Sequence, residues 1–168
     1  MKWIGAALVL LSCGWYGFSV AARQKAEENA LRNVLRSLHF MECELQYRLA
    51  SLPELCREAG QESKGPVARV FTALGEELER QIAPNAAVCM DAALSKTRNV
   101  PPQAAAMLRD VGKSLGRFDL QGQLSALGDA GAHCKELLDK QLGNQEIRLR
   151  GYRTLGLCAG AALAVLLL

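Results

Sequence analysis

The sequence predicts an all-α fold, in which a small helical bundle lies between an N-terminal and a C-terminal transmembrane helix. Three observations support this prediction. Apolar residues recur three and four positions apart through most of the chain, which is the period of an amphipathic helix. The middle of the chain is rich in Ala, Leu, Glu, Gln and Arg, which are strong helix formers, and it contains no convincing period-two strand. An uncharged apolar stretch lies at each end.

These patterns divide the chain of 168 residues into three segments. We expect an N-terminal transmembrane helix at 1–22, a helical bundle at 23–153 and a C-terminal transmembrane helix at 154–168. The length leaves room for one modest domain. The formal net charge of +3 is small and the basic residues are dispersed among acidic ones, so nucleic-acid binding is not expected.

The first apolar stretch, Trp3–Ala22, is uncharged over about twenty residues, which is long enough to cross the hydrocarbon core as a helix. A cleaved signal peptide is the alternative, because Lys2 precedes the apolar run and the small residues 19–21 resemble a cleavage site. The run is longer than a usual signal core, and Arg23 and Lys25 follow it directly. We therefore expect a retained span.

The second span, Thr154–Leu168, is short, because fifteen helical residues reach only about 22 Å across a core of about 30 Å. The three residues before it supply the missing length if Arg153 snorkels to the interface. Basic residues follow the first span and precede the second. The positive-inside rule therefore predicts a two-pass cell-membrane protein with a cytoplasmic central domain and both termini outside.

Two long helices are expected to carry the bundle. Asp119–Leu168 contains no proline and is expected to form one helix, with Asp119 as its N-cap. The segment 26–52, continuous with the first span, has an apolar seam in a four-three alternation. The members of that seam are Leu31, Leu35, Leu38, Glu42, Leu45, Leu49 and Leu52.

Glu42 is the one carboxylate in this seam. We expect it to be buried and to have a partner in the segment 112–123, because an unpaired buried charge is costly. The alternative is a slightly rotated helix that leaves Glu42 at the edge of the seam. Glu44 projects elsewhere and is expected to pair with Arg48 one turn later.

Shorter helices fill the region between the two long ones. Ser51 and Glu54 have the spacing of a capping box, with Pro53 just inside, and predict a short helix to about Ala59. A polar loop is expected at 60–65. Further helices are expected after Pro66, around 88–94 and after Pro101-Pro102, followed by a turn at 116–119.

No motif for catalysis, a cofactor or a metal emerges from the sequence. The six cysteines are scattered without a C-x-x-C pair, and in a cytoplasmic domain they are expected to be reduced, buried, apolar groups. In the second span Gly156, Gly160 and Ala164 form a row of small residues that permits close helix packing in lipid. The alternative is that small residues are simply common in membrane helices.

Three stretches carry a resemblance to a known family. They are Glu42-Cys43-Glu44-Leu45-Gln46-Tyr47, then Leu52-Pro53-Glu54, then Gly112-x-x-Leu115-Gly116-x-x-Asp119-x-x-x-Gln123. Together with a span at each end and Leu155-Gly156 opening the last one, they resemble the stage III sporulation protein AB family of endospore-forming bacteria. Departures from that pattern are Met90, where the family often has tryptophan, and Gly122, where it usually has a polar residue.

The resemblance implies a function that composition does not. That family belongs to a channel complex built between mother cell and forespore, and it is similar to the F-type platform proteins of type II secretion and type IV pilus systems. It implies a non-enzymatic scaffold on the mother-cell side that couples a cytoplasmic ATPase to other membrane subunits of the sporulation channel, with a possible homo-oligomer. The alternatives are an unrelated bitopic scaffold that mediates oligomerisation and a secreted helical domain.

Overall fold

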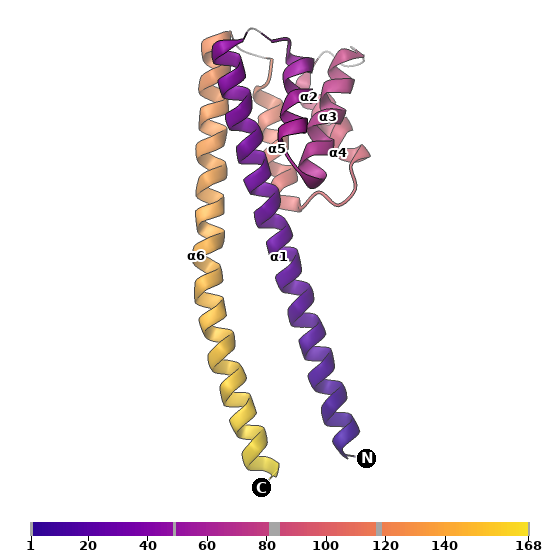
Figure 1. The fold of residues 1–168 in the computed structure, drawn as a ribbon, viewed down its shortest axis with the longest axis vertical. Helices are drawn as coiled ribbons and strands as arrows, with labels where there is room; N and C mark the ends of the chain where they lie inside the picture. Colours follow the sequence, from indigo (N-terminus) through magenta and orange to yellow (C-terminus); the bar gives the residue numbers. More distant parts are fainter. Residues whose placement is uncertain (1, 49, 81–84, 117–118, 168) are drawn as a thin grey trace. The chain divides into compact units, whose positions relative to one another are not determined.

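The computed structural model describes the backbone of residues 2–48, 50–80, 85–116 and 119–167, and the side chains of these stretches between 22 and 143. Over these residues the chain forms six α-helices and no strand (Figure 1). The all-α fold is therefore confirmed. The helices are α1 (Lys2–Tyr47), α2 (Leu52–Glu62), α3 (Gly65–Glu79), α4 (Ala86–Lys96), α5 (Pro102–Ser114) and α6 (Leu120–Leu167).

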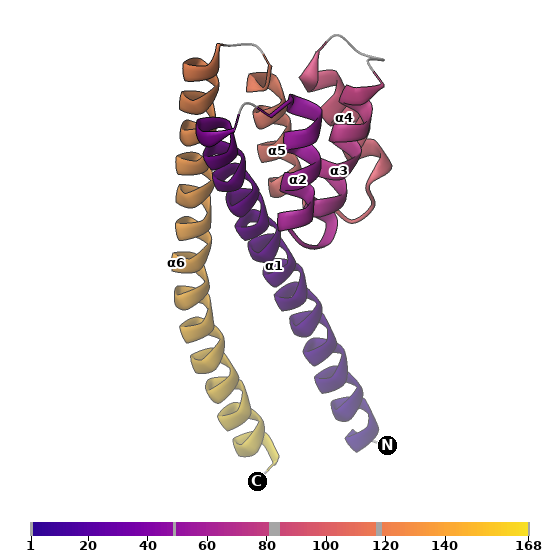
Figure 2. The ribbon, with the colours of Figure 1, turned by 45° about the horizontal axis from the view of Figure 1, so that its top comes forward.

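The chain divides into two compact units, Met1–Cys134 and Lys135–Leu168. The second unit is the continuation of α6, which stays helical to Leu167. In the first unit, α2 to α5 pack each on the next, and α1 packs along α2, α3 and α5 (Figure 2). Large side chains from all five helices fill the interior. Those with no more than 1% exposure include Leu31, Leu38, Met41, Leu55, Phe71, Leu74, Met90, Leu108 and Leu115.

Glycines allow α2 and α3 to approach closely. A Cβ added at Gly75 would lie 2.8 Å from the backbone oxygen of Pro53, and one at Gly60 would lie 2.6 Å from Thr72 Oγ1. Real Cβ atoms do not come that close to other heavy atoms. Each helix therefore contributes one glycine to the contact. Arg57 on α2 adds an ion pair with Glu79 on α3 at 3.4 Å.

The prediction of a continuous first helix is confirmed, but its expected end is wrong, because α1 stops at Tyr47 and Leu52 begins α2. Leu49 lies outside the described residues. The seam is also rotated from the expected one. Leu31, Leu38 and Leu45 are buried as expected, but Val34 and Met41 fill the intervening positions with 0% exposure, in place of Leu35 and Glu42.

The predicted start of α2 agrees with the structure, but its predicted end near Ala59 does not. Ser51 occupies the N-cap position and Pro53 lies in the first turn, but the Ser51 side chain makes no capping hydrogen bond. The expected capping box is therefore not formed. The loop expected at 60–65 is also wrong, because α2 continues to Glu62 and only residues 63 and 64 separate it from α3.

Within the side chains that the structure describes, no helix is both long and apolar enough to cross a bilayer. The two expected spans, 1–22 and 154–168, fall almost entirely outside those side chains. The backbone of residues 2–22 and 154–167 is helical, as part of α1 and α6. The membrane spans and the domain boundaries at 22 and 154 therefore stay predictions.

Candidate interaction surface at the tip of the domain

Four helices end together at the end of the first unit that is farthest from the N-terminus of α1. They are the last turn of α1, the first turns of α2 and α6, and the last turn of α5 (Figures 1 and 2). Six of the described residues exposed there define what we call the tip surface, namely Tyr47, Arg48, Ser51, Gly116, Asp119 and Leu120. Much of the family resemblance therefore gathers at one end of the domain.

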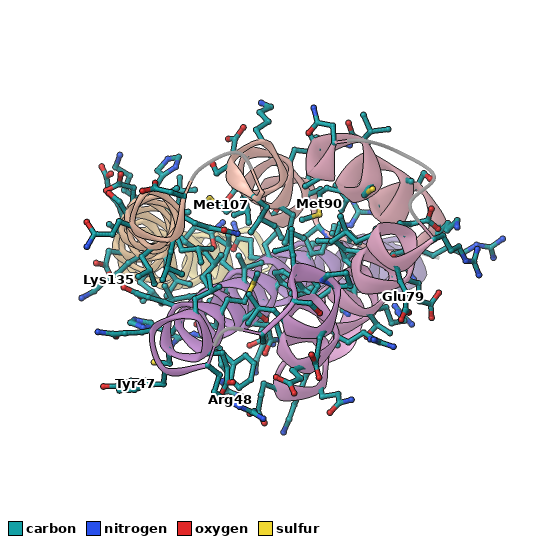
Figure 3. The ribbon with its side chains drawn as sticks, turned by 90° about the horizontal axis from the view of Figure 1, so that it is seen from above. Tyr47, Arg48, Glu79, Met90, Met107 and Lys135 are labelled. Atoms are coloured by element: carbon teal, nitrogen blue, oxygen red, sulfur yellow. The ribbon has the colours of Figure 1, made fainter. Side chains whose placement is uncertain are left out.

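The end of α1 presents an aromatic and a cationic side chain to solvent. Tyr47 is 82% exposed, which is far above what an aromatic side chain normally shows in a monomer. Arg48 Nη1 pairs with Glu44 Oε2 at 3.3 Å, which confirms the predicted contact. Tyr47 and Arg48 both lie at the outside of the domain, whereas Met90 and Met107 lie in its interior (Figure 3).

Gly116 ends α5 with a positive φ of 73°, the left-handed region that only glycine adopts without strain. The residue before it, Leu115, is 1% exposed and keeps a helical hydrogen bond to the carbonyl oxygen of Val111 at 3.0 Å. A Cβ at Gly116 would lie 3.4 Å from Leu52 Cδ2, so the ends of α5 and α2 are neighbours. Leu115 anchors this turn in the core and Gly116 redirects the chain.

Asp119 caps α6 as predicted. Its Oδ1 accepts a hydrogen bond from the backbone amide of Gly122 at 3.1 Å, and its carbonyl oxygen accepts from Gln123 at 2.9 Å. A carboxylate also suits the positive end of the helix dipole. Leu120, the first residue of α6, is 42% exposed, so this cap places an apolar side chain next to a charge on the tip surface.

The expected burial of Glu42 is wrong. Its side chain is 39% exposed, and Oε2 lies 3.7 Å from Nδ1 of the exposed His39 on the same helix. Oε1 lies 3.8 Å from the Cβ position of Gly128 on α6, so the carboxylate stands at the edge of the contact between α1 and α6. Among the described residues it has no partner from the segment 112–123. The alternative of a helix rotated at the seam edge agrees with the structure.

The other residues of the resemblance are not counted in the tip surface, and several of them serve packing. Gly112 brings α5 against α4, since a Cβ there would lie 2.7 Å from Met90 Cβ. Pro53 meets Gly75 through its carbonyl oxygen. Glu54 is exposed in the first turn of α2, where its charge suits the helix dipole. The structure therefore separates residues that shape the core from residues that face solvent.

Glu77 is a buried acid that the sequence analysis missed. Its side chain is 10% exposed and accepts a hydrogen bond from Lys96 Nζ, which joins α3 to the end of α4. That hydrogen bond holds the pKa of Glu77 below its ordinary value, against the effect of desolvation. Its position three residues after the buried Leu74 is the signal that would have found it.

The described side chains include four cysteines, and no disulfide joins any of them there. Three of them are buried. Burial raises the pKa of Cys56 to about 12 and that of Cys134 to about 11, and it also raises the pKa of Cys89. Cys43 is exposed, so the expectation of burial is wrong for this thiol. The described side chains contain no cluster of His, Cys, Asp and Glu suited to a metal ion.

The row Gly156, Gly160 and Ala164 lies outside the described side chains. Whether these residues form packing faces is therefore still a prediction.

Comparisons with known proteins agree with the resemblance of the sequence. The family described as stage III sporulation protein AB matches residues 2–168. A relative from Bacillus subtilis (strain 168), stage III sporulation protein AB, is 22% identical over 171 residues, covering 100% of this chain and 99% of the relative. A solved structure of a stage III sporulation protein AB shares the fold, with a TM-score of 0.63 and 19% identity, covering 73% of this chain and 98% of the other. The chain belongs to the stage III sporulation protein AB family.

Proposed function

We propose that this protein is a membrane platform subunit of the sporulation channel between mother cell and forespore. In this proposal its two spans anchor it in the cell membrane, and its tip surface receives a cytoplasmic secretion-type ATPase. The observation that carries the proposal is the run of α1 as one helix from Lys2 to Tyr47. An apolar segment suited to lipid and an exposed tip are thereby connected by a single continuous element.

The length of α1 sets the distance between the proposed membrane span and the tip surface. The 25 residues from Ala22, where the expected span ends, to Tyr47 rise about 38 Å along the helix. A helix of that length would hold the tip surface well clear of the headgroups, where a large cytoplasmic partner can approach. Packing of α2, α3 and α5 along α1 supports this helix, whose side chains are buried from Ala30 at 3% exposure and Leu31 at 0%.

The tip surface has a composition that suits a protein partner. It combines the exposed Tyr47 with Leu120, and both are flanked by charges at Arg48 and Asp119. Aromatic residues and arginine are enriched at the centres of interfaces, and a rim of polar groups surrounds them. We assign no catalytic, cofactor or metal role to these residues, and we propose that the protein works as a scaffold.

Tyr47→Ser and Leu120→Ser test the docking proposal in the native host. Both side chains are exposed, so the fold should persist, and we expect loss of heat-resistant spores together with loss of co-purification with the ATPase. Val88→Ser is the matched control, because Val88 is 54% exposed on α4 and lies outside the tip surface. Normal sporulation of both tip variants, or an equal defect in the control, would contradict docking at the tip.

We also propose that the small-residue row of the second span contacts other membrane subunits, or a second copy of the chain. Gly156→Leu should then weaken co-purification with the membrane partners without changing the melting temperature of the bundle. Retention of every partner by this variant would show that the row is not an interface. In the signal-peptide alternative the first span is cleaved and the helical domain lies outside the cell on a C-terminal anchor, so locating the bundle distinguishes that alternative from the platform.

A further inference from the structure

The first unit carries opposite charge at its two ends. Its anchor-side end, toward the N-terminus of α1, comprises residues 22–36, 59–69 and 94–104, with the α2–α3 and α4–α5 connectors (Figure 1). This end holds eight basic and three acidic residues, while residues 37–58, 70–93 and 105–134 hold six basic and eleven acidic ones. The basic residues of the anchor-side end are Arg23, Lys25, Arg32, Arg36, Lys64, Arg69, Lys96 and Arg98.

Three of these cations gather around the two connectors. Arg69 on α3 donates a hydrogen bond through Nη2 to the backbone oxygen of Arg98 at 3.3 Å, which fastens the α4–α5 connector to α3. Lys64 lies in the α2–α3 connector, directly before α3. All three side chains belong to exposed residues, and none has a carboxylate partner within 4.0 Å among the described residues.

Most basic side chains at the other end are paired. Arg48, Arg57, Arg109 and Lys113 each have a carboxylate oxygen within 3.4 Å. Surface ion pairs of this kind contribute little to stability, but they show that carboxylates were available to most of these cations. Lys64, Arg69 and Arg98 have no such pairing, and Arg69 instead holds the backbone of Arg98, so three exposed cations of one end of the unit are left to an anion from outside the domain.

We propose that Lys64, Arg69 and Arg98 form a contact surface for the anionic phospholipid headgroups of the membrane in which the chain is anchored. The inference rests on the proposed membrane anchoring. Ser37 Oγ donates to the backbone oxygen of Ala59 at 3.3 Å, so the last turn of α2 lies level with the middle of α1. Lys64, five residues further down, therefore lies about 15 Å above Ala22 along α1.

That height brings Lys64 near the electrostatic range of the bilayer, and Arg69, the fifth residue of α3, lies about one helical turn higher. The headgroup layer adds about 5–7 Å to each side of the hydrocarbon core, and the Debye length is about 8 Å at physiological ionic strength. Long Lys and Arg side chains cover the remaining distance, and a tilt of α1 toward the side that carries the bundle shortens it. Each basic residue near an anionic surface contributes about 1 kcal/mol, a factor of about five in association. The contact would fix the tilt of the bundle and hence the direction in which the tip surface points.

Photo-crosslinking of the full chain in nanodiscs tests this proposal. The crosslinker p-benzoylphenylalanine is placed at Gln61, an exposed uncharged position in the last turn of α2. Discs contain either phosphatidylcholine alone or phosphatidylcholine with phosphatidylglycerol, and lipid adducts are measured by mass spectrometry. The test variant combines Lys64→Gln, Arg69→Gln and Arg98→Gln. The matched control combines Lys113→Gln, Arg57→Gln and Arg80→Gln.

We expect adducts in the anionic discs that fall at least about fivefold in the test variant and in high salt, and that persist in the control. Circular dichroism checks that both variants stay folded. Equal adduct yields in the two lipids, or equal losses in the two variants, would overturn the headgroup contact while leaving the anchoring intact. If the chain failed to float with the discs, the anchoring itself would be wrong, and the inference would fall with it.

Discussion

Replacement of Gly75 by alanine tests whether the α2–α3 contact is as close as the structure shows. The added Cβ would lie 2.8 Å from the carbonyl oxygen of Pro53 and 2.8 Å from Arg57 Cγ. The Pro53 oxygen belongs to the backbone of α2, so it cannot move aside alone and the two helices must separate. Alanine gains up to about 1 kcal/mol of helix propensity over glycine, while overpacking of a core contact costs about 1–3 kcal/mol.

The net expectation for Gly75→Ala is a loss of about 1–2 kcal/mol in the free energy of unfolding, because the clash opposes backbone. The matched control is Gly131→Ala on α6, where the new Cβ would meet Leu35 Cδ1 at an ordinary 3.8 Å. That variant should be neutral or more stable by up to about 1 kcal/mol. Chemical denaturation of both proteins provides the measurement. A Gly75→Ala protein as stable as the control would refute the close approach of α2 and α3.

Three further substitutions test individual side chains by thermal or chemical unfolding. Glu42→Ala should change the free energy of unfolding by less than about 0.5 kcal/mol, because its carboxylate is partly exposed and only weakly paired; a loss of several kcal/mol would contradict this. Asp119→Ala should cost about 1 kcal/mol by removing the α6 cap, whereas Asp119→Ser should restore most of it; equal losses would refute the capping role. The lowered pKa of Glu77 means that its charge stabilises the fold at neutral pH, and that this contribution is lost as the pH falls through the folded-state value. The melting temperature should therefore fall less between pH 6 and about pH 3 in Glu77→Gln than in the wild type, and an equal fall would refute it.

The sequence was sufficient for the helical fold and for most of the buried apolar residues, because their spacing is regular. The spacing alone placed the α1 seam wrongly, at Leu35 and Glu42 in place of Val34 and Met41. Leu31, Leu38 and Leu45 satisfy both a four-three and a three-four alternation, so only the packing of other helices on α1 decides that Val34 and Met41 fill the places between them. Glu42 was assigned to the core for the same reason.

Two other misses also come from tertiary contacts. Gly60 resembled the start of a loop, but it lies inside α2. The residue at that position is glycine because α3 approaches too closely there for any side chain. Ser51 has the spacing of a capping box without making its hydrogen bond. By contrast Asp119, Gly116 and the Glu44–Arg48 pair follow local rules, and the structure agrees with those expectations for capping, turning and pairing.

Thiol accessibility in sporulating cells tests the central proposal most directly, namely that the bundle is anchored in the membrane and faces the cytoplasm. Cys43 is an exposed native thiol on the bundle, and Glu62→Cys adds a second at the exposed end of α2. The account predicts that both resist a membrane-impermeant maleimide in intact cells, react after lysis, and stay in the membrane fraction. Labelling of either thiol in intact cells, or recovery of the protein in the soluble fraction, would contradict it.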